Sequence, residues 1–325
     1  MTTLNRHALN VLDATPEDAE DVLSVIAVSF GARPVLEPPS TATNETVDTI
    51  AAALAESGGL LARRRGKAIG AMLFDRSRPG LLGFRRVSVE PSHQDRGVAS
   101  AMVGVAEDTA EERGCDGIWL RVREELPATV EFWTRRRYLP ARRDGATLEL
   151  GKTLWLAREL PTADDALAFG TRLAGLVRAG DLIVLSGKLG AGKTTLTQGV
   201  GAGLGVRGPV TSPTFVISRI HPSLVGGPPL VHVDAYRLGG AAEVDDLDLD
   251  ATTDDAVTVV EWGSGKAEQL SDSRLEVTLE RRRGTDLDPL GTKVAEDIVD
   301  EMRVVTVKPH GPRWLGVPLR STLIG

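Results

Sequence analysis

Residues 186–200, SGKLGAGKTTLTQGV, decide the fold of the C-terminal half of this chain. They follow the short apolar run DLIVLSG at 181–187 and carry the pattern GxxxxGK[ST] from Gly187 to Thr194. Glycines let the backbone turn tightly, so that consecutive N–H groups converge on an anion at the start of the next helix. An apolar strand, a glycine loop and a helix in this order predict an α/β sheet with a phosphate-binding loop.

The side chains of the loop predict which ligand it holds. The ammonium of Lys193 can reach the outer phosphates of a nucleotide, and the hydroxyl of Thr194 can bind Mg²⁺. We therefore expect the phosphates of a nucleotide and Mg²⁺ as ligands, bound by the residues of the loop and the helix start: Gly187, Gly190, Ala191, Gly192, Lys193, Thr194 and Thr195.

Two later apolar runs end in acids. LVHVD ends at Asp234, and AVTVVE ends at Glu261. Ligands of open α/β sheets bind at the carboxyl ends of the strands, where both acids are expected. One acid could hold Mg²⁺ through water while the other activates the attacking water, and the spacing does not rank them.

The order of helical and strand patterns predicts two α/β domains. A chain of 325 residues with 42% hydrophobic and 26% charged residues suits two soluble globular domains. Helical patterns at 16–30, 44–57 and 97–114 alternate with strand patterns at 59–76, 84–91, 117–124 and 147–156, and the order restarts with a helix at 161–180. We predict domains at 1–155 and 156–305, followed by a C-terminal tail at 306–325.

Charge and composition exclude several classes of protein. A net charge of −7 argues against broad, sequence-independent binding of nucleic acid. The single cysteine, Cys115, cannot form an internal disulfide. No run of about 18 apolar residues is present, so we expect a cytoplasmic protein with no membrane segment.

The N-terminal half contains a second glycine loop, at 94–99. Its residues QDRGVA join the strand pattern 84–91 to the helix pattern 97–114. Backbone N–H groups at such a helix start suit a pyrophosphate. Glu90, at the end of the preceding strand, is the candidate base for removing a proton from an amine.

Four ordered motifs in the C-terminal half resemble the bacterial TsaE family, over about residues 156–305. They are GKLGAGKTTLTQG at 187–199, TSPTFVI at 211–217, HVDAYRL at 232–238 and VVEWG at 259–263. TsaE proteins are P-loop ATPases of tRNA threonylcarbamoyladenosine synthesis. The resemblance implies ATP hydrolysis in support of the TsaB/TsaD threonylcarbamoyl transferase, with tRNA reached only indirectly.

The same resemblance implies roles for individual residues. Asp234 occupies the Walker-B-like position, Glu261 and Trp262 match the catalytic Glu-Trp pair, and Thr214 senses the metal and the γ-phosphate. The implied metal ligands are Thr194, Asp234 and Thr214. Lys188 and Ser264 depart from the family, which usually has acids at both positions.

The N-terminal half, over about residues 8–153, resembles the GNAT acyl-CoA transferases in its strand–loop–helix–strand order and its EFWTRRRYLP segment. The resemblance implies acetyl-CoA as cofactor and an acceptor that the sequence does not identify. Trp133 stands where these enzymes often have a tyrosine acid, and Tyr138 stands where they usually have Phe. The implied cofactor contacts are Val87, Val89, Gln94, Arg96, Gly97, Val98 and Ala99.

Two alternatives remain open for the function. The N-terminal half could be a non-catalytic CoA-binding or docking module, which the Trp133 substitution favours slightly. The P-loop half could be a small-molecule kinase, which requires a substrate pocket and a phosphorylated product.

Overall fold

The computed structural model describes residues 9–247, 253–281 and 302–324, which form two compact units. The units comprise Met1–Lys152 and Thr153–Gly325, so the division falls just before the predicted boundary at residue 156. In the described ranges, no helix is both long and apolar enough to cross a membrane. Both units combine helices with one mixed sheet, which confirms the predicted α/β class.

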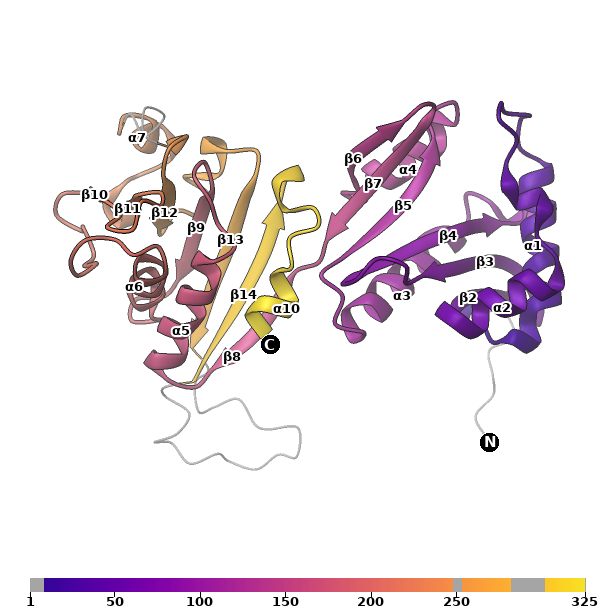
Figure 1. The fold of residues 1–325 in the computed structure, drawn as a ribbon, viewed down its shortest axis with the longest axis horizontal. Coiled ribbons are helices and arrows are strands. Elements are labelled where there is room, and N and C mark those ends of the chain that lie inside the picture. Colours follow the sequence, from indigo (N-terminus) through magenta and orange to yellow (C-terminus); the bar gives the residue numbers. More distant parts are fainter. Residues whose placement is uncertain (1–8, 248–252, 282–301, 325) are drawn as a thin grey trace. The chain divides into compact units, whose positions relative to one another are not determined.

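The N-terminal unit is a seven-stranded sheet in the order β1-β2-β3-β4-β5-β7-β6 with helices on both faces (Figure 1). Leu61 and Leu73 pack under the first two helices, whereas a Cβ added at Gly70 would meet Val98 and Met102 of the third helix. The elements are β1 Leu9–Asp13, α1 Ala19–Gly31, α2 Val47–Ser57, β2 Gly59–Arg64, β3 Lys67–Asp75, β4 Leu81–Val89, α3 Val98–Glu112, β5 Gly117–Arg123, α4 Pro127–Thr134, β6 Leu139–Asp144 and β7 Thr147–Thr153.

Strands β4 and β5 separate after a short parallel ladder, as Figure 1 shows. The ladder joins residues 81–84 of β4 to residues 117–120 of β5. Near the separation, Arg86 has a φ of 51° and the β3–β4 register shifts. The backbone of β4 beyond Phe84 is therefore not hydrogen-bonded to β5.

The C-terminal unit is a seven-stranded sheet in the order β10-β11-β12-β9-β13-β14-β8. Strands β11, β12, β9 and β13 are parallel to one another, and the outer three pair antiparallel. The elements are β8 Leu156–Leu160, α5 Ala163–Ala174, β9 Leu182–Gly187, α6 Lys193–Gly203, β10 Ser218–His221, β11 Leu230–Asp234, α7 Ala241–Asp245, β12 Val257–Glu261, β13 Arg274–Arg281, β14 Arg303–His310 and α10 Leu319–Ile324.

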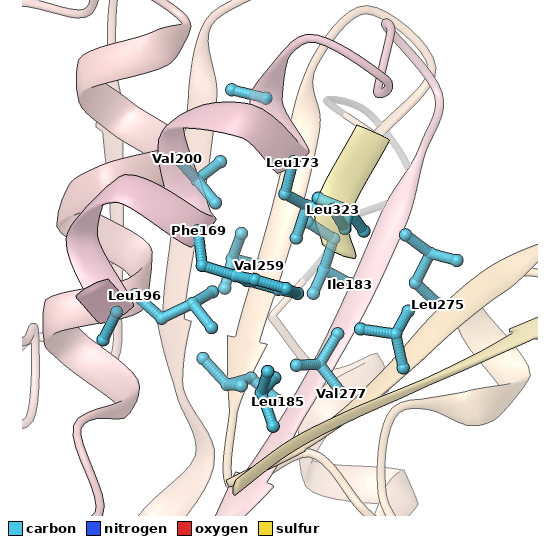
Figure 2. Packing of buried hydrophobic residues seen from close by; sticks show 14 of the residues in the cluster. Phe169, Leu173, Ile183, Leu185, Leu196, Val200, Val259, Leu275, Val277 and Leu323 are labelled. Carbon is cyan, nitrogen blue, oxygen red and sulfur yellow. The ribbon is translucent and has the colours of Figure 1, made fainter. Parts of the chain in front are cut away.

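Helices α5, α6 and α10 cover one face of this sheet with a single apolar cluster. Phe169 lies at its centre, with side chains from the helices on one side and from the strands on the other (Figure 2). A second cluster covers the other face, where Val244 of α7 packs with Val231 and Val233 of β11. The central strands β9, β11 and β12 are thus buried on both sides, which explains why they are nearly continuous apolar runs, whereas β13 alternates buried and partly exposed residues.

The predicted tail at 306–325 is wrong, because this segment is part of the core. Strand β14 pairs with both β13 and β8, and Val305 and Val307 alternate into the apolar cluster. Beyond the strand, Trp314, Leu319 and Leu323 are fully buried. Prolines and mixed polarity suggested a tail, but a strand buried on one face requires only alternate apolar residues.

Trp314→Ala should destabilise the C-terminal unit strongly. Trp314 is 0% exposed, and truncating a buried aromatic side chain costs about 3–5 kcal/mol. Trp155→Ala is the matched control, because Trp155 is 45% exposed. Urea unfolding followed by circular dichroism measures the difference, and equal unfolding of both variants would contradict the packing of this segment.

Candidate functional site

The glycine loop between β9 and α6 needs glycine for its backbone conformation. Gly187, Gly190 and Gly192 have φ values of 146°, 75° and 100°, which side chains with a Cβ rarely adopt. A Cβ at Gly187 would also lie 2.4 Å from the carbonyl oxygen of Leu279 on β13. The amides at the start of α6 therefore stand open to an anion, and the loop fits a nucleotide's phosphates.

Lys193 is the first residue of α6, and its side chain folds back over the loop. Its Nζ donates to the carbonyl oxygens of Gly187 at 2.8 Å and Lys188 at 3.1 Å. The same Nζ lies 3.6 Å from the ring centroid of Trp262. Burial lowers the pKa of Lys193, and the charges of Glu261 and Asp234 partly oppose that shift. The cation is thus held directly at the phosphate-binding loop.

Glu261, the last residue of β12, is 2% exposed and is held through both carboxylate oxygens. Its Oε2 accepts from the hydroxyl of Thr194 at 3.1 Å. Its Oε1 accepts from the hydroxyl of Thr197 at 3.2 Å and lies 2.8 Å from Nε2 of His232. The carboxylate therefore links the P-loop helix to two strands of the sheet.

Asp234, the last residue of β11, holds the segment that precedes β10. Its Oδ2 accepts from the hydroxyls of Ser212 and Thr214, each at 2.7 Å, and its Oδ1 accepts from the amide of Tyr236 at 3.0 Å. Burial raises the pKa of Asp234, but these hydrogen bonds to the carboxylate outweigh it and hold the pKa below its ordinary value. An ionised Asp234 therefore fixes the 211–217 segment at the sheet edge.

The predicted metal ligands Thr194, Asp234 and Thr214 and the predicted catalytic Glu261 form two neighbouring pairs. Asp234 and Glu261 are register partners on β11 and β12. Thr194 contacts Glu261, whereas Thr214 contacts Asp234. Carboxylate and hydroxyl oxygens are the protein ligands that suit Mg²⁺, so the donor chemistry of both pairs fits that ion.

Sequence reasoning missed His232 and Thr197, although each carried a signal. His232 lies two residues before Asp234 on a strand, and alternate strand residues share a face. Thr197 lies three residues after Thr194 on a helix, and such residues are neighbours on one side. Both spacings place the missed side chains beside residues that the sequence singled out.

Two arginines from β13 and β14 lie beside the loop. A Cβ at Gly192 would be 3.2 Å from Nε of Arg303, and one at Gly190 would be 3.9 Å from Nη1 of Arg281. The two arginines are register partners on antiparallel strands. Together with Lys193 they surround the loop with positive charge, which favours an anionic ligand.

The position of α6 depends on a close crossing with α5. A Cβ at Gly199 would lie 2.1 Å from the carbonyl oxygen of Leu167, and one at Gly170 would lie 2.2 Å from that of Leu196. The two helix backbones are therefore in contact, and no larger residue fits at either glycine. This crossing sets where the first turn of α6 meets the loop.

The second glycine loop leads into α3 through Gly97. Gly97 caps the helix with a φ of 79°, and Asp95 has a φ of 56°. A Cβ at Gly97 would meet nothing within 4 Å, so the need for glycine is conformational. The amides of the first helical turn, from Val98, point toward the loop and can bind an anion. Arg96 and Gln94 are exposed beside them.

Glu90 lies at the end of β4, where β4 has separated from β5. Its carboxylate oxygens lie 2.9 and 3.0 Å from Nζ of Lys67, and Oε2 lies 3.3 Å from Nδ1 of His93. Glu90 is thus in an ion pair with Lys67. Its position suits a base, but the ion pair with Lys67 competes for the same oxygens.

The two aromatic residues that bear on a catalytic acid are packed in the core. Trp133 is 3% exposed, and its ring centroid lies 4.9 Å from that of Tyr138. The buried hydroxyl of Tyr138 donates to Glu107 at 2.9 Å. Burial, followed by the charge of Glu107, raises the pKa of Tyr138 well above its ordinary value. Neither residue is placed to protonate a leaving group.

Comparison with known families matches both halves of the chain. Residues 160–287 match the family described as threonylcarbamoyl adenosine biosynthesis protein TsaE, and residues 30–137 match the acetyltransferase (GNAT) family. The two resemblances inferred from the sequence are therefore confirmed.

Individual proteins are similar to one half or the other. The TsaE protein of Streptomyces coelicolor is 60% identical over 146 residues, which cover 45% of this chain and 90% of that protein. The TsaE protein of Mycobacterium tuberculosis H37Rv is 52% identical over 129 residues, covering 38% of this chain and 77% of that protein. Among solved structures, the PaiA N-acetyltransferase of Thermoplasma acidophilum in complex with coenzyme A is 14% identical, with a TM-score of 0.41, and covers 45% of this chain and 99% of its own.

Gly199→Ala and Gly104→Ala should change stability in opposite directions. A methyl group at Gly199 would overlap the α5 backbone, and overpacking of this kind costs about 1–3 kcal/mol. Gly104 lies in α3 with nothing within 4 Å of an added Cβ, so alanine there should stabilise by about 0.5–1 kcal/mol. Calorimetry of the full chain measures both, and a neutral Gly199→Ala would show that the helices can move apart freely.

Proposed function

Since the chain belongs to the TsaE family through its C-terminal half and also carries a GNAT domain, we propose that its C-terminal unit hydrolyses ATP in support of tRNA threonylcarbamoyladenosine formation. The hydrogen bond between Thr194 and Glu261 is the observation that carries this proposal. It supports the proposal because it joins a buried acid to Thr194, whose hydroxyl is the expected ligand of the nucleotide's metal in this motif.

Each residue of the C-terminal site has a separate role in this proposal. ATP with Mg²⁺ supplies the phosphoanhydride bond that water breaks. The loop amides and Lys193 bind and orient the phosphates, and Thr194 presents its hydroxyl on the metal side. Glu261 accepts a proton at its carboxylate or orients the water that carries it. Asp234 holds Thr214 and Ser212 in the segment that faces the γ-phosphate.

The proposed partner is a TsaB/TsaD-like threonylcarbamoyl transferase, through which the chain acts on tRNA indirectly. Two large apolar side chains are exposed, Leu189 in the loop at 82% and Phe215, in the segment held by Asp234, at 85%. Exposed apolar residues grouped beside a site are typical of protein–protein contacts. Transfer of the threonylcarbamoyl group belongs to the partner in this proposal.

Glu261→Gln should abolish most ATP hydrolysis while nucleotide binding persists. The amide keeps the size of the side chain but cannot accept a proton, and such a loss costs about a hundredfold or more in rate. The measurement uses a reconstituted system from which this chain is omitted and then restored as wild type or variant. It follows the release of phosphate from ATP and the threonylcarbamoylation of tRNA. Full restoration by the variant would contradict the proposed site, and a phosphorylated small molecule in place of free phosphate would indicate the kinase alternative.

We further propose that the N-terminal unit binds acetyl-CoA and transfers its acetyl group to an amine. The cofactor supplies a thioester-bound acetyl group. The first-turn amides of α3 and the side chain of Arg96 bind the pyrophosphate. The backbone of β4 at Val87 and Val89 does not pair with β5 and is the strand that pantetheine would pair with, in exchange for the hydrogen bonds that Arg33 and Gln94 make to the carbonyl oxygens of Val87 and Val89. Glu90 removes the proton from the acceptor amine, directly or through water.

A non-catalytic CoA-binding module is the second candidate for this unit. The burial of Trp133 and the hydrogen bond of Tyr138 to Glu107 favour it, because both leave the unit without an aromatic acid at the usual place. The two candidates share the cofactor site and differ only in turnover.

Acetyl-CoA turnover should distinguish the two candidates. Wild type should bind CoA in calorimetry and acetylate an amine or a ribosomal peptide, and Glu90→Gln should lower the rate by about a hundredfold without weakening binding. Tight CoA binding with no transfer to any tested acceptor would support the non-catalytic module. Gly97→Val, which forces a Cβ into the left-handed region, should weaken CoA binding in either case.

A further inference from the structure

The two carboxylate oxygens of Glu261 have unequal surroundings. Oε1 is held from inside the protein by Thr197 and His232, both of which are fully buried. Oε2 contacts only the hydroxyl of Thr194 among the hydrogen bonds described for it, and Thr194 lies at the phosphate loop. One oxygen is thus anchored in the core, and the other faces the reacting end of the site.

Of the two side chains that contact Oε1, His232 lies closer than Thr197. Its Nε2 lies 2.8 Å from Oε1, with side-chain exposures of 0% for His232 and 3% for Glu261. His232 pairs with Val259 in the parallel register, so it lies diagonally across from Glu261 on the neighbouring strand. With the proton on Nε2, His232 donates to Oε1 in this contact.

We propose that His232 is a positioning residue that fixes the carboxylate of Glu261 with Oε2 toward Thr194. This inference rests on the proposed ATPase function and assigns a role within that site. Glutamate has several rotamers, and a reacting carboxylate must be held close to its productive orientation. His232 contacts Oε1 at 2.8 Å, and the hydroxyl of Thr197 is shared between Oε1 and the carbonyl oxygen of Lys193. Oε2 is therefore the oxygen that would meet the nucleotide's metal or the attacking water.

A second buried histidine provides a matched control. His221 on β10 is 4% exposed, and its ring centroid lies 6.4 Å from that of His232. It lies on the edge strand, one strand further from Glu261. Substitutions at His221 therefore test the cost of replacing a buried imidazole in the same layer without removing a donor from Glu261.

Asparagine and glutamine at position 232 separate positioning from packing. The amide of glutamine can place a donor near the position of Nε2, whereas that of asparagine is too short and reaches only the Nδ1 position. Both substitutions bury a side-chain amide in place of the imidazole, so both carry the cost of that burial. Only the reach toward Oε1 differs.

The test measures ATP hydrolysis and its Mg²⁺ dependence with the full chain. His232→Asn should lower kcat by about tenfold to a hundredfold, as loss of an outer partner of a ligand does, with KM for ATP changed by less than about threefold. It should also raise the Mg²⁺ concentration needed for half-maximal rate. His232→Gln should stay within about threefold of wild type, and His221→Asn should leave kcat and the Mg²⁺ dependence unchanged.

Four results would overturn the assignment. Equal losses for His232→Asn and His232→Gln would show that reach toward Oε1 does not matter. A loss in His221→Asn as large as that in His232→Asn would indicate packing alone. If the wild-type chain hydrolyses ATP and His232→Asn has the same kcat, His232 does not position Glu261, and the proposed function stays intact. No hydrolysis by wild type, alone or with its partners, would overturn both.

Discussion

The register of three parallel strands is the constraint on which the C-terminal site depends. Asp234 lies opposite Glu261, and Glu261 lies opposite Leu185, just before the glycine loop. Parallel strands end at the same edge, so this register brings two acids and the phosphate loop together without any long-range side-chain contact. The hydrogen bonds of Thr194, Thr197 and His232 then fix what the backbone has already placed.

Much of this arrangement could be predicted from the sequence because its signals are local. The loop motif is contiguous, and each acid directly follows its own apolar run. The loop and each strand end could therefore be predicted from its own short stretch of sequence. The pairing of Thr194 with Glu261 and of Thr214 with Asp234 could not, because strand order is a property of the sheet. Arg303 follows the loop by more than a hundred residues, and only the β13–β14 pairing brings it there.

The C-terminal segment shows a different limit of sequence reasoning. Strand β14 buries only Val305 and Val307 in the apolar cluster, and Leu319 and Leu323 mark a single turn of a six-residue helix, which is too short to stand out as a periodic pattern. Their burial depends on a cluster built by α5 and the sheet, which the segment itself does not encode.

In the N-terminal unit, the sequence identified Trp133 as a departure from the tyrosine that GNAT enzymes often have. The structure gives the reason, because the ring fills core space against Phe84 and Tyr138.

The glycine crossing of α5 and α6 has a mechanical consequence for the C-terminal unit. Backbone lies against backbone at Gly170 and Gly199, so neither helix can roll or slide past the other without a steric clash. The two helices must therefore move as one rigid body. Since α6 begins at the glycine loop, this contact also fixes the start of α6 relative to α5.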